Sequence, residues 1–412
     1  MFGTPHILDA DNFEHGGRLM ADGKGKLGGR EVVIVEAVRT PVGRGHPEKG
    51  YYKDLHPSNL LAKTYSELIS RSGVDPNEVG DVIAGCVQQW GEQSINIGRN
   101  AWLEAGLPQE VPATTVDRQC GSAQQAVNFA ATLIASGVHD VAIGGGVEHM
   151  GKNSFAKAGQ MMGEYGMAFS KELMERYDLI PQGLSAEMIA DKWEIPRSEL
   201  DELGLRSQQL ARRATDEGRF EREMIPMQVN GDTYVTDQGL RETTLEGLAA
   251  LKPAFKEDGK ITAGNSSQVS DGAAAVLLMT REKADALGLK PRARIYDITT
   301  VGVDPVIMLT GPIPATRKLL ERNGMKMDDI DLVEINEAFA SVMAAWQREL
   351  EPDMDRVNVN GGAIAIGHPL GSTGARLITT LLHEMERSDK EMGLVTMCCG
   401  GGLGTGTLIQ RV

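Results

Sequence analysis

The seven residues Asp117-Arg118-Gln119-Cys120-Gly121-Ser122-Ala123 join two segments of opposite character. An apolar, β-rich run (111–116) precedes them, and a run of small residues with helical character (126–135) follows them. The pattern therefore places Cys120 where a strand turns into a helix. The free N–H groups and positive end of that helix would stabilise a thiolate, and adjacent N–H groups would bind an oxyanion. The alternative is a buried structural cysteine, because free cysteines are among the most buried residues.

The second half of the chain repeats landmarks of the first. Three pairs recur at nearly one offset: Asp81-Val82-Ile83 with Asp331-Leu332-Val333 and Gly121-Ser122 with Gly371-Ser372, both 250 residues apart, and the triple glycines at 144–146 and 400–402, 256 residues apart. Strands that alternate with helices indicate a mostly parallel sheet covered on both faces. The repeat predicts two similar α/β halves whose equivalent helix starts lie close together at a pseudo-twofold axis.

Residues 150–268 interrupt the first half. They are rich in Met, Lys and Glu, and they predict an inserted loop domain that caps the α/β body. We therefore divide the chain into a mobile extension (1–29), a first half (30–149 with 269–290), the loop domain (150–268) and a second half (291–412).

Composition narrows the class of protein. The net charge of −15, from 42 basic and 57 acidic residues, disfavours nucleic acid and anionic membranes as partners. No apolar run reaches the about 20 residues of a membrane span, and residues 1–29 lack the features of a targeting peptide. The four cysteines have no zinc spacing, so we expect no metal and a reducing compartment, the cytoplasm. No dinucleotide or P-loop motif is present, and we expect no bound cofactor.

Three further segments carry candidate chemistry. His368 lies two residues before the position equivalent to Cys120, where its imidazole would accept the thiol proton. Cys398 and Cys399 end a predicted strand; only one should face the site, because neighbouring strand residues point to opposite faces, and spacing does not decide which. Asn336 follows another strand, where it would bind an oxyanion or water, or cap a helix.

Taken together, these segments resemble the four signature blocks of the thiolases: Cys120-Gly-Ser, Asn336-Glu-Ala-Phe, Gly367-His368-Pro and Cys398-Cys399-Gly-Gly-Gly. The resemblance covers residues 31–412 and implies a duplicated five-layered α/β/α/β/α body with an inserted loop domain. It implies that Cys120 is the nucleophile, that His368 activates it, and that His368 forms an oxyanion hole with a water held by Asn336. It also implies that Cys398, rather than Cys399, is the second acid/base, and that the N–H groups of Cys120 and Gly400 form the second oxyanion hole.

The same resemblance implies the substrate-binding positions. Ser267 matches a serine that contacts the pantetheine arm of CoA, and Met308 and Phe339 match positions of the acyl pocket and pantetheine tunnel. Arg241 lies near a family arginine that meets the CoA nucleotide, although its spacing to Thr243-Thr244 is off by one residue. Thiolases specialised for acetoacetyl-CoA carry a His-Met pair where this chain has Pro181-Gln182, which favours a longer or bulkier acyl group.

The expected function is thiolytic cleavage of 3-ketoacyl-CoA by CoA, as in fatty-acid β-oxidation, through an acyl-cysteine intermediate. Two alternatives remain open: biosynthetic condensation of two acetyl-CoA molecules, and a non-catalytic lipid-binding protein of the same fold. The expected partners are acyl-CoA and CoA, the latter as a substrate. The family resemblance also implies a homodimer or homotetramer, and leaves a hydratase or dehydrogenase partner unknown.

Overall fold

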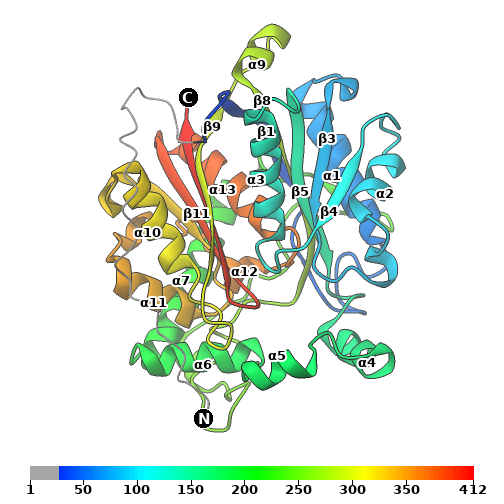
Figure 1. Cartoon of the computed structure of the whole chain (residues 1–412). Helices are drawn as coiled ribbons and strands as arrows, with labels where there is room; N and C mark the ends of the chain where they lie inside the picture. The colour runs from blue at the N-terminus through cyan, green and yellow to red at the C-terminus, as the bar shows by residue number, and fades with distance from the viewer. Residues whose placement is uncertain (1–26) are drawn as a thin grey trace, which may run out of the picture.

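The computed structural model describes residues 27–412, so the predicted mobile extension lies almost entirely outside the described residues. A ten-stranded sheet is the framework (Figure 1). Its first half has the order β1-β8-β5-β3-β4, and β2 pairs with β8. The strands of this half are β1 (Val32–Arg39), β2 (Gly43–Arg44), β3 (Asp81–Gly85), β4 (Ala113–Val116), β5 (Val141–His149) and β8 (Ser270–Thr280).

The second half continues the sheet in the order β9-β12-β11-β10. These strands are β9 (Ala293–Gly302), β10 (Leu332–Ile335), β11 (Met392–Cys399) and β12 (Leu403–Arg411). Only two residue pairs, Val33–Arg294 and Ile34–Ala293, join β1 to β9. A parallel bridge between Val333 and Val357 stands where the first half has the pairing of β3 with β4. Both halves therefore have the same topology.

The sheet register confirms the repeat. Val82 pairs with Ile143 in the first half, and Leu332 pairs with Gly393 in the second, so equivalent residues differ by 250 in number. The match of the two triple glycines is wrong. Glycines 144–146 lie within β5, whereas glycines 400–402 form the turn between β11 and β12.

The two glycine triplets serve different physical purposes. A Cβ on Gly146 would lie 2.0 Å from the carbonyl oxygen of Gly371, so no side chain fits on the strand where the second half of the chain crosses it. Gly401 and Gly402 instead adopt left-handed backbone angles, with φ of 76° and 77°, which glycine tolerates without steric cost.

Helices and sheet form five layers (Figure 1). On the outer face of the first half lie α1 (Pro57–Ser72) and α2 (Ile97–Glu104); on that of the second lie α10 (Pro312–Asn323) and α11 (Ala340–Leu350). Between the half-sheets, α3 (Ser122–Ala135) contacts α13 (Thr373–Arg387). Small residues permit this contact, because a Cβ on Gly374 would lie 2.3 Å from the Gln124 nitrogen. The central hydrophobic core surrounds these two helices. Short elements complete the two halves: α9 (Arg281–Leu287), α12 (Ala363–Ile366) and 3-10 turns at Pro76–Glu78, Gly91–Gln93, Met327–Asp329 and Met354–Arg356.

Between β5 and β8 the chain leaves the sheet and forms mainly helices, of which α4, α5 and α6 run along the lower side of the view in Figure 1. The elements of this segment are α4 (Phe155–Tyr165), α5 (Lys171–Arg176), α6 (Gln182–Lys192), α7 (Arg197–Asp216), β6 (Met227–Val229), β7 (Asp232–Tyr234) and α8 (Leu245–Ala249). No helix within residues 27–412 is long and apolar enough to cross a membrane.

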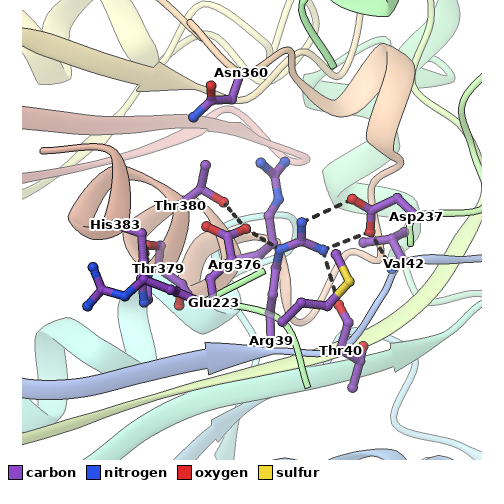
Figure 2. A network of polar contacts seen from close by, with 12 residues as sticks. Arg39, Thr40, Val42, Glu223, Asp237, Asn360, Arg376, Thr379, Thr380 and His383 are labelled. Atoms are coloured by element: carbon purple, nitrogen blue, oxygen red, sulfur yellow. Dashed lines mark hydrogen bonds and ion pairs between the residues drawn. The ribbon is translucent and has the colours of Figure 1, made fainter. Parts of the chain in front are cut away.

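A buried ion cluster ties this segment to the body (Figure 2). Arg39, on β1, binds Glu223 and Asp237 of the inserted segment, and Thr380 of α13 donates to Glu223. Burial lowers the pKa of Arg39, but the two carboxylates outweigh this effect and raise it above its ordinary value. Arg39 is therefore a cation enclosed by both parts of the chain.

Candidate active site

Cys120 lies in a constrained turn between β4 and α3. Gln119 adopts a left-handed φ of 50°, which is uncommon for a residue with a side chain. The carboxylate of Asp117 accepts the Gln119 N–H at 2.6 Å, and the Ser122 hydroxyl accepts the Arg118 N–H at 2.8 Å. These two contacts hold the turn in the shape that brings Cys120 to the start of α3.

The resting state of Cys120 is a thiol. Burial raises its pKa to about 11, although the N–H groups of Cys120 and Gly400 and the side-chain amide of Gln182 lower it. The negative charge of Glu148 raises it further. The expectation that the helix start stabilises a thiolate is therefore only half right: the N–H groups act in that direction, but burial is the larger effect. Ionisation requires a base.

His368 is a neutral imidazole, as a base that accepts the Cys120 proton must be. Its Nδ1 lies 2.6 Å from the Thr373 hydroxyl, which lies 2.7 Å from the carbonyl oxygen of Pro369. Because the hydroxyl has one hydrogen and donates it to that carbonyl, we assign the imidazole proton to Nδ1 and a free lone pair to Nε2. Burial and then the charge of Arg376 lower the pKa of His368 to about 3, so the ring is neutral at physiological pH.

Asn336 directly follows β10 and is fully buried. Its Nδ2 lies 3.3 Å from Nε2 of His368 and 4.0 Å from the sulfur of Cys398. Its Oδ1 has no hydrogen-bond partner among the described residues. The alternative that Asn336 caps a helix is wrong, because α11 begins at Ala340 and has Phe339 at its cap position.

The two neighbouring cysteines of β11 point to different surroundings. Cys398 lies beside the Asn336 amide, and burial, followed by proximity to Cys120, raises its pKa. The Cys399 sulfur instead packs against α3, 2.7 Å from where a Cβ on Gly121 would lie, and it belongs to the central core. Cys120, His368, Asn336 and Cys398 thus meet at one place, and they come from both halves of the fold.

The substrate-binding candidates are placed less uniformly. Ser267 is half-buried and donates its N–H to Ala338 at 2.9 Å, and its neighbour Ser266 bridges to Phe339. Phe339 contacts Phe255 of the inserted segment edge to face. Met308 is buried, with an unusual φ of 26°.

Arg241 is exposed and does not contact the four central residues. Its backbone N–H donates to the side-chain oxygen of Gln208, while its guanidinium makes a long contact of 3.5 Å to the Ala263 carbonyl. Burial, followed by the charge of Arg44, lowers its pKa. Two guanidinium groups therefore lie near each other at this edge of the molecule.

Two site residues, Thr373 and Glu148, were absent from the sequence prediction, and Gln182 appeared there only as part of the Pro181-Gln182 departure. Gln182, at the start of α6, places its Nε2 2.7 Å from where a Cβ on Gly400 would lie. Thr373 orients His368, and Glu148 approaches both Cys120 and the His368 segment. For Thr373, a hydroxyl five residues after His368 was an available signal. Glu148 comes from a segment remote from the motifs. Residues 27–412 contain no group of three or more His, Cys, Asp or Glu side chains arranged to hold a metal ion.

Comparison with known proteins identifies the class. The N-terminal thiolase domain matches residues 32–282, and the C-terminal thiolase domain matches residues 289–411. The chain therefore belongs to the thiolase family, and it is an acyltransferase.

Individual relatives carry names of two kinds. A steroid 3-ketoacyl-CoA thiolase of Mycobacterium tuberculosis is 46% identical over 93% of this chain and 94% of its own length. An acetyl-CoA acetyltransferase of Syntrophomonas wolfei is 44% identical over 93% of this chain and its full length. The crystal structure of the acetyl-CoA acetyltransferase of Bacillus anthracis has a TM-score of 0.86 and 39% identity, and the match covers 94% of this chain and all of that one.

Proposed function

We propose that this thiolase works in the degradative direction and cleaves a 3-ketoacyl-CoA with CoA to give acetyl-CoA and a shortened acyl-CoA. The observation that carries the proposal is the meeting of two thiols, Cys120 and Cys398, with a neutral His368 and the Asn336 amide. One thiol holds the acyl group while the other moves a proton, which is the requirement of covalent acyl transfer. A 3-ketoacyl-CoA thiolase is also the name of several relatives.

The first half-reaction forms the acyl-enzyme. Nε2 of His368 takes the proton of the Cys120 thiol, and the sulfur attacks C3 of the substrate. The C2–C3 bond then breaks, its electron pair forms the enolate of acetyl-CoA, and the Cys398 thiol protonates C2. The protonated Nε2 of His368 and a water on Asn336 stabilise the oxygen of the enolate.

The second half-reaction releases the product. The Cys398 thiolate takes the proton of an incoming CoA thiol, and the CoA sulfur attacks the acyl carbon on Cys120. The N–H groups of Cys120 and Gly400 bind the oxyanion, and both already point at the Cys120 sulfur. Cys120 then leaves as a thiolate and recovers its proton from His368. No bound cofactor is needed, because CoA enters as a substrate.

The acyl group is the open part of the substrate. Gln182 stands beside Cys120. Pro181-Gln182 occupies the place of the His-Met pair of acetoacetyl-CoA thiolases, and we propose that this change admits a longer or bulkier chain. Met308, Phe339 and Ser267 would line the acyl and pantetheine path. Arg241, with Arg44 beside it, would meet the phosphates of CoA, since two neighbouring cations favour an anion.

Two measurements test this function. Mass spectrometry after mixing with acyl-CoA should find an acyl adduct on Cys120, and an adduct confined to another residue would contradict the mechanism. A panel of 3-ketoacyl-CoA substrates of increasing chain length should show higher kcat/KM for longer or branched chains than for acetoacetyl-CoA.

Biosynthetic condensation of two acetyl-CoA molecules is the second candidate, because a relative named acetyl-CoA acetyltransferase is 44% identical to this chain. A clear preference for acetoacetyl-CoA in the substrate panel would favour it. We also propose that the enzyme is a cytoplasmic homodimer or homotetramer, which sedimentation equilibrium of the full chain tests.

A further inference from the structure

Glu148 is a buried carboxylate that the reaction steps above do not use. It stands near the end of β5, and the offset of 250 residues makes it the counterpart of Cys398 at the end of β11. The duplicated fold thus places an acid/base thiol at one of two equivalent positions and a carboxylate at the other.

Every lone pair of this carboxylate has an N–H donor. Oε2 accepts the backbone N–H groups of Val87 and Gly371, both at 2.9 Å. Oε1 accepts the Gln88 N–H at 3.1 Å and the side-chain amide of Gln93 at 2.7 Å. These partners can only donate, so a proton on Glu148 would oppose one of them. Burial raises the pKa of Glu148, and the four donors oppose that shift. The hydrogen-bond geometry itself favours the charged form, because each of the four contacts is an N–H donor.

One of the four donors belongs to the other half of the molecule. Gly371 lies three residues after His368 and two before Thr373, the residue that orients the His368 ring. Its segment is threaded tightly into the first half, because a Cβ on Gly371 would lie 2.4 Å from the Val147 oxygen and 2.7 Å from the Cys86 Cα. Glu148 supplies the charged hydrogen bond at this crossing.

We propose that Glu148 is a positioning residue for the thiolase reaction: its carboxylate anchors the segment that carries His368 to the ends of β3 and β5, and its negative charge faces the Cys120 thiol. The inference rests on the proposed function for the roles of Cys120 and His368. It assigns a purpose to the non-catalytic copy of the Cys398 position.

The charge has a second effect that can be measured. Glu148 raises the pKa of Cys120, so it keeps the nucleophile protonated until His368 accepts its proton. His368 and the two cysteines of β11, Cys398 and Cys399, are further titratable groups near the Cys120 thiol. The Cys86 thiol lies on the other side of Glu148, with its sulfur 4.0 Å from Oε1 of that carboxylate. Among the groups that act on the Cys120 thiol, Glu148 is the carboxyl group.

The first test is steady-state kinetics of thiolysis. Glu148→Gln places an amide N–H against a donor, and we expect kcat to fall about 100-fold with KM for CoA changed less than about twofold, because a misplaced catalytic group costs rate rather than binding. The matched control is Glu384→Gln, which removes a buried carboxylate that binds Asn360 and Arg387 near the other end of α13; its kcat should stay within about twofold. A folded Glu148→Gln enzyme with kcat within about threefold of the parent would overturn the proposal.

The second test does not depend on turnover. In a His368→Ala background, which removes the base, iodoacetamide should alkylate Cys120 roughly tenfold faster at pH 8 when Glu148→Gln is added, because a loss of negative charge lowers the thiol pKa. Glu148→Asp keeps the charge and should show no such gain, although its shorter reach should still lower kcat about tenfold. This variant carries the kinetic test if Glu148→Gln does not fold. Alkylation that is unchanged or slower in Glu148→Gln would overturn the proposal, whereas faster alkylation in a protein without thiolase activity would overturn the proposed function alone.

Discussion

At the scale of single residues, the site depends on which nitrogen of His368 bears the proton. Thr373 settles this by accepting from Nδ1, because its own hydrogen is committed to the Pro369 carbonyl. The neutral ring can then act as a base through Nε2, and after it takes the proton it becomes a donor at the same atom. In the proposed mechanism, one imidazole therefore serves proton transfer and oxyanion binding in succession.

Removal of the Thr373 hydroxyl should disturb this order. Thr373→Val leaves Nδ1–H without its partner, and we expect kcat to fall about 10- to 100-fold, since general-base catalysis contributes about 10²–10⁴. Thr379→Val is the matched control, because its hydroxyl makes the same backbone contact one and a half turns further along α13 and does not touch His368. Equal kcat in the two variants would contradict the tautomer assignment.

The choice between the paired cysteines is tested in the same way. Cys398→Ala should lower kcat by about 10²–10⁴, because it removes the group that protonates the enolate and activates CoA. Cys399→Ala, the same change one residue away, should retain activity within about threefold and lose some stability from its core position. Steady-state thiolysis with thermal unfolding distinguishes them, and the reverse pattern of kcat would assign the acid/base role to Cys399.

At the scale of elements, β10 contains a buried carboxyl group, Glu334, whose ionisation the fold disfavours. Burial raises the pKa of Glu334 to about 8, against the attraction of Arg376, whose Nη1 lies 3.7 Å from Oε2. The three guanidinium nitrogens of Arg376 have no hydrogen-bond partner among residues 27–412. Asn336 directly follows this strand, so its amide stands at the end of an element with a titratable interior.

Glu334 should make stability depend on pH. Between the ordinary carboxyl pKa, 4.5, and about 8, the folded state binds more protons than the unfolded state, so its stabilising contribution is complete below 4.5 and is lost as pH rises through about 8. Glu334→Gln should flatten the decline of the unfolding free energy between about pH 5 and 9, measured by urea titration. The exposed substitution Glu110→Gln should leave the slope unchanged, and an equal slope in Glu334→Gln would contradict the assigned pKa.

How far the sequence predicts the site follows from how each residue is positioned. Cys120, His368 and Asn336 stand next to strand ends and helix starts, and local pattern with an internal repeat is enough to locate them. Gln182 and Glu148 reach the site through long-range folding. The neighbourhood of Glu148 contains no chemical signal, and Pro181-Gln182 indicated acyl specificity but not the position of Gln182 beside Cys120. Burial is also a property of the whole fold, which is why the helix start alone suggested a thiolate at Cys120 when burial favours the thiol.

At the scale of the whole molecule, the inserted segment is attached through charge as well as apolar contact. Arg39 is enclosed by Glu223 and Asp237, and Figure 2 shows its guanidinium between the two carboxylates. The two glycine triplets show the limit of sequence at this scale. Their sequences are identical, but Gly146 lies where another part of the chain crosses the strand, and Gly401 lies in a turn.

Loss of Arg39 should therefore loosen the whole structure. Arg39→Met leaves two buried carboxylates unpaired, and we expect the free energy of unfolding to fall by about 3–5 kcal/mol. The control Arg411→Met removes an exposed ion pair with Asp389 and should cost less than about 1 kcal/mol. Urea unfolding of both variants provides the comparison, and similar losses would show that Arg39 is not a structural clamp.

The duplicated architecture also has a consequence for how such an enzyme can evolve. Fusion of two copies of an ancestral domain produces every catalytic position twice, yet one crevice needs only one set. Where the working set has Cys120, Asn336 and Cys398, the spare positions hold Leu370, Cys86 and Glu148. The spare positions are free from selection for chemistry, so they can be selected for positioning the working residues of the other half. A symmetric ancestor thereby becomes an asymmetric enzyme without the gain of a new fold.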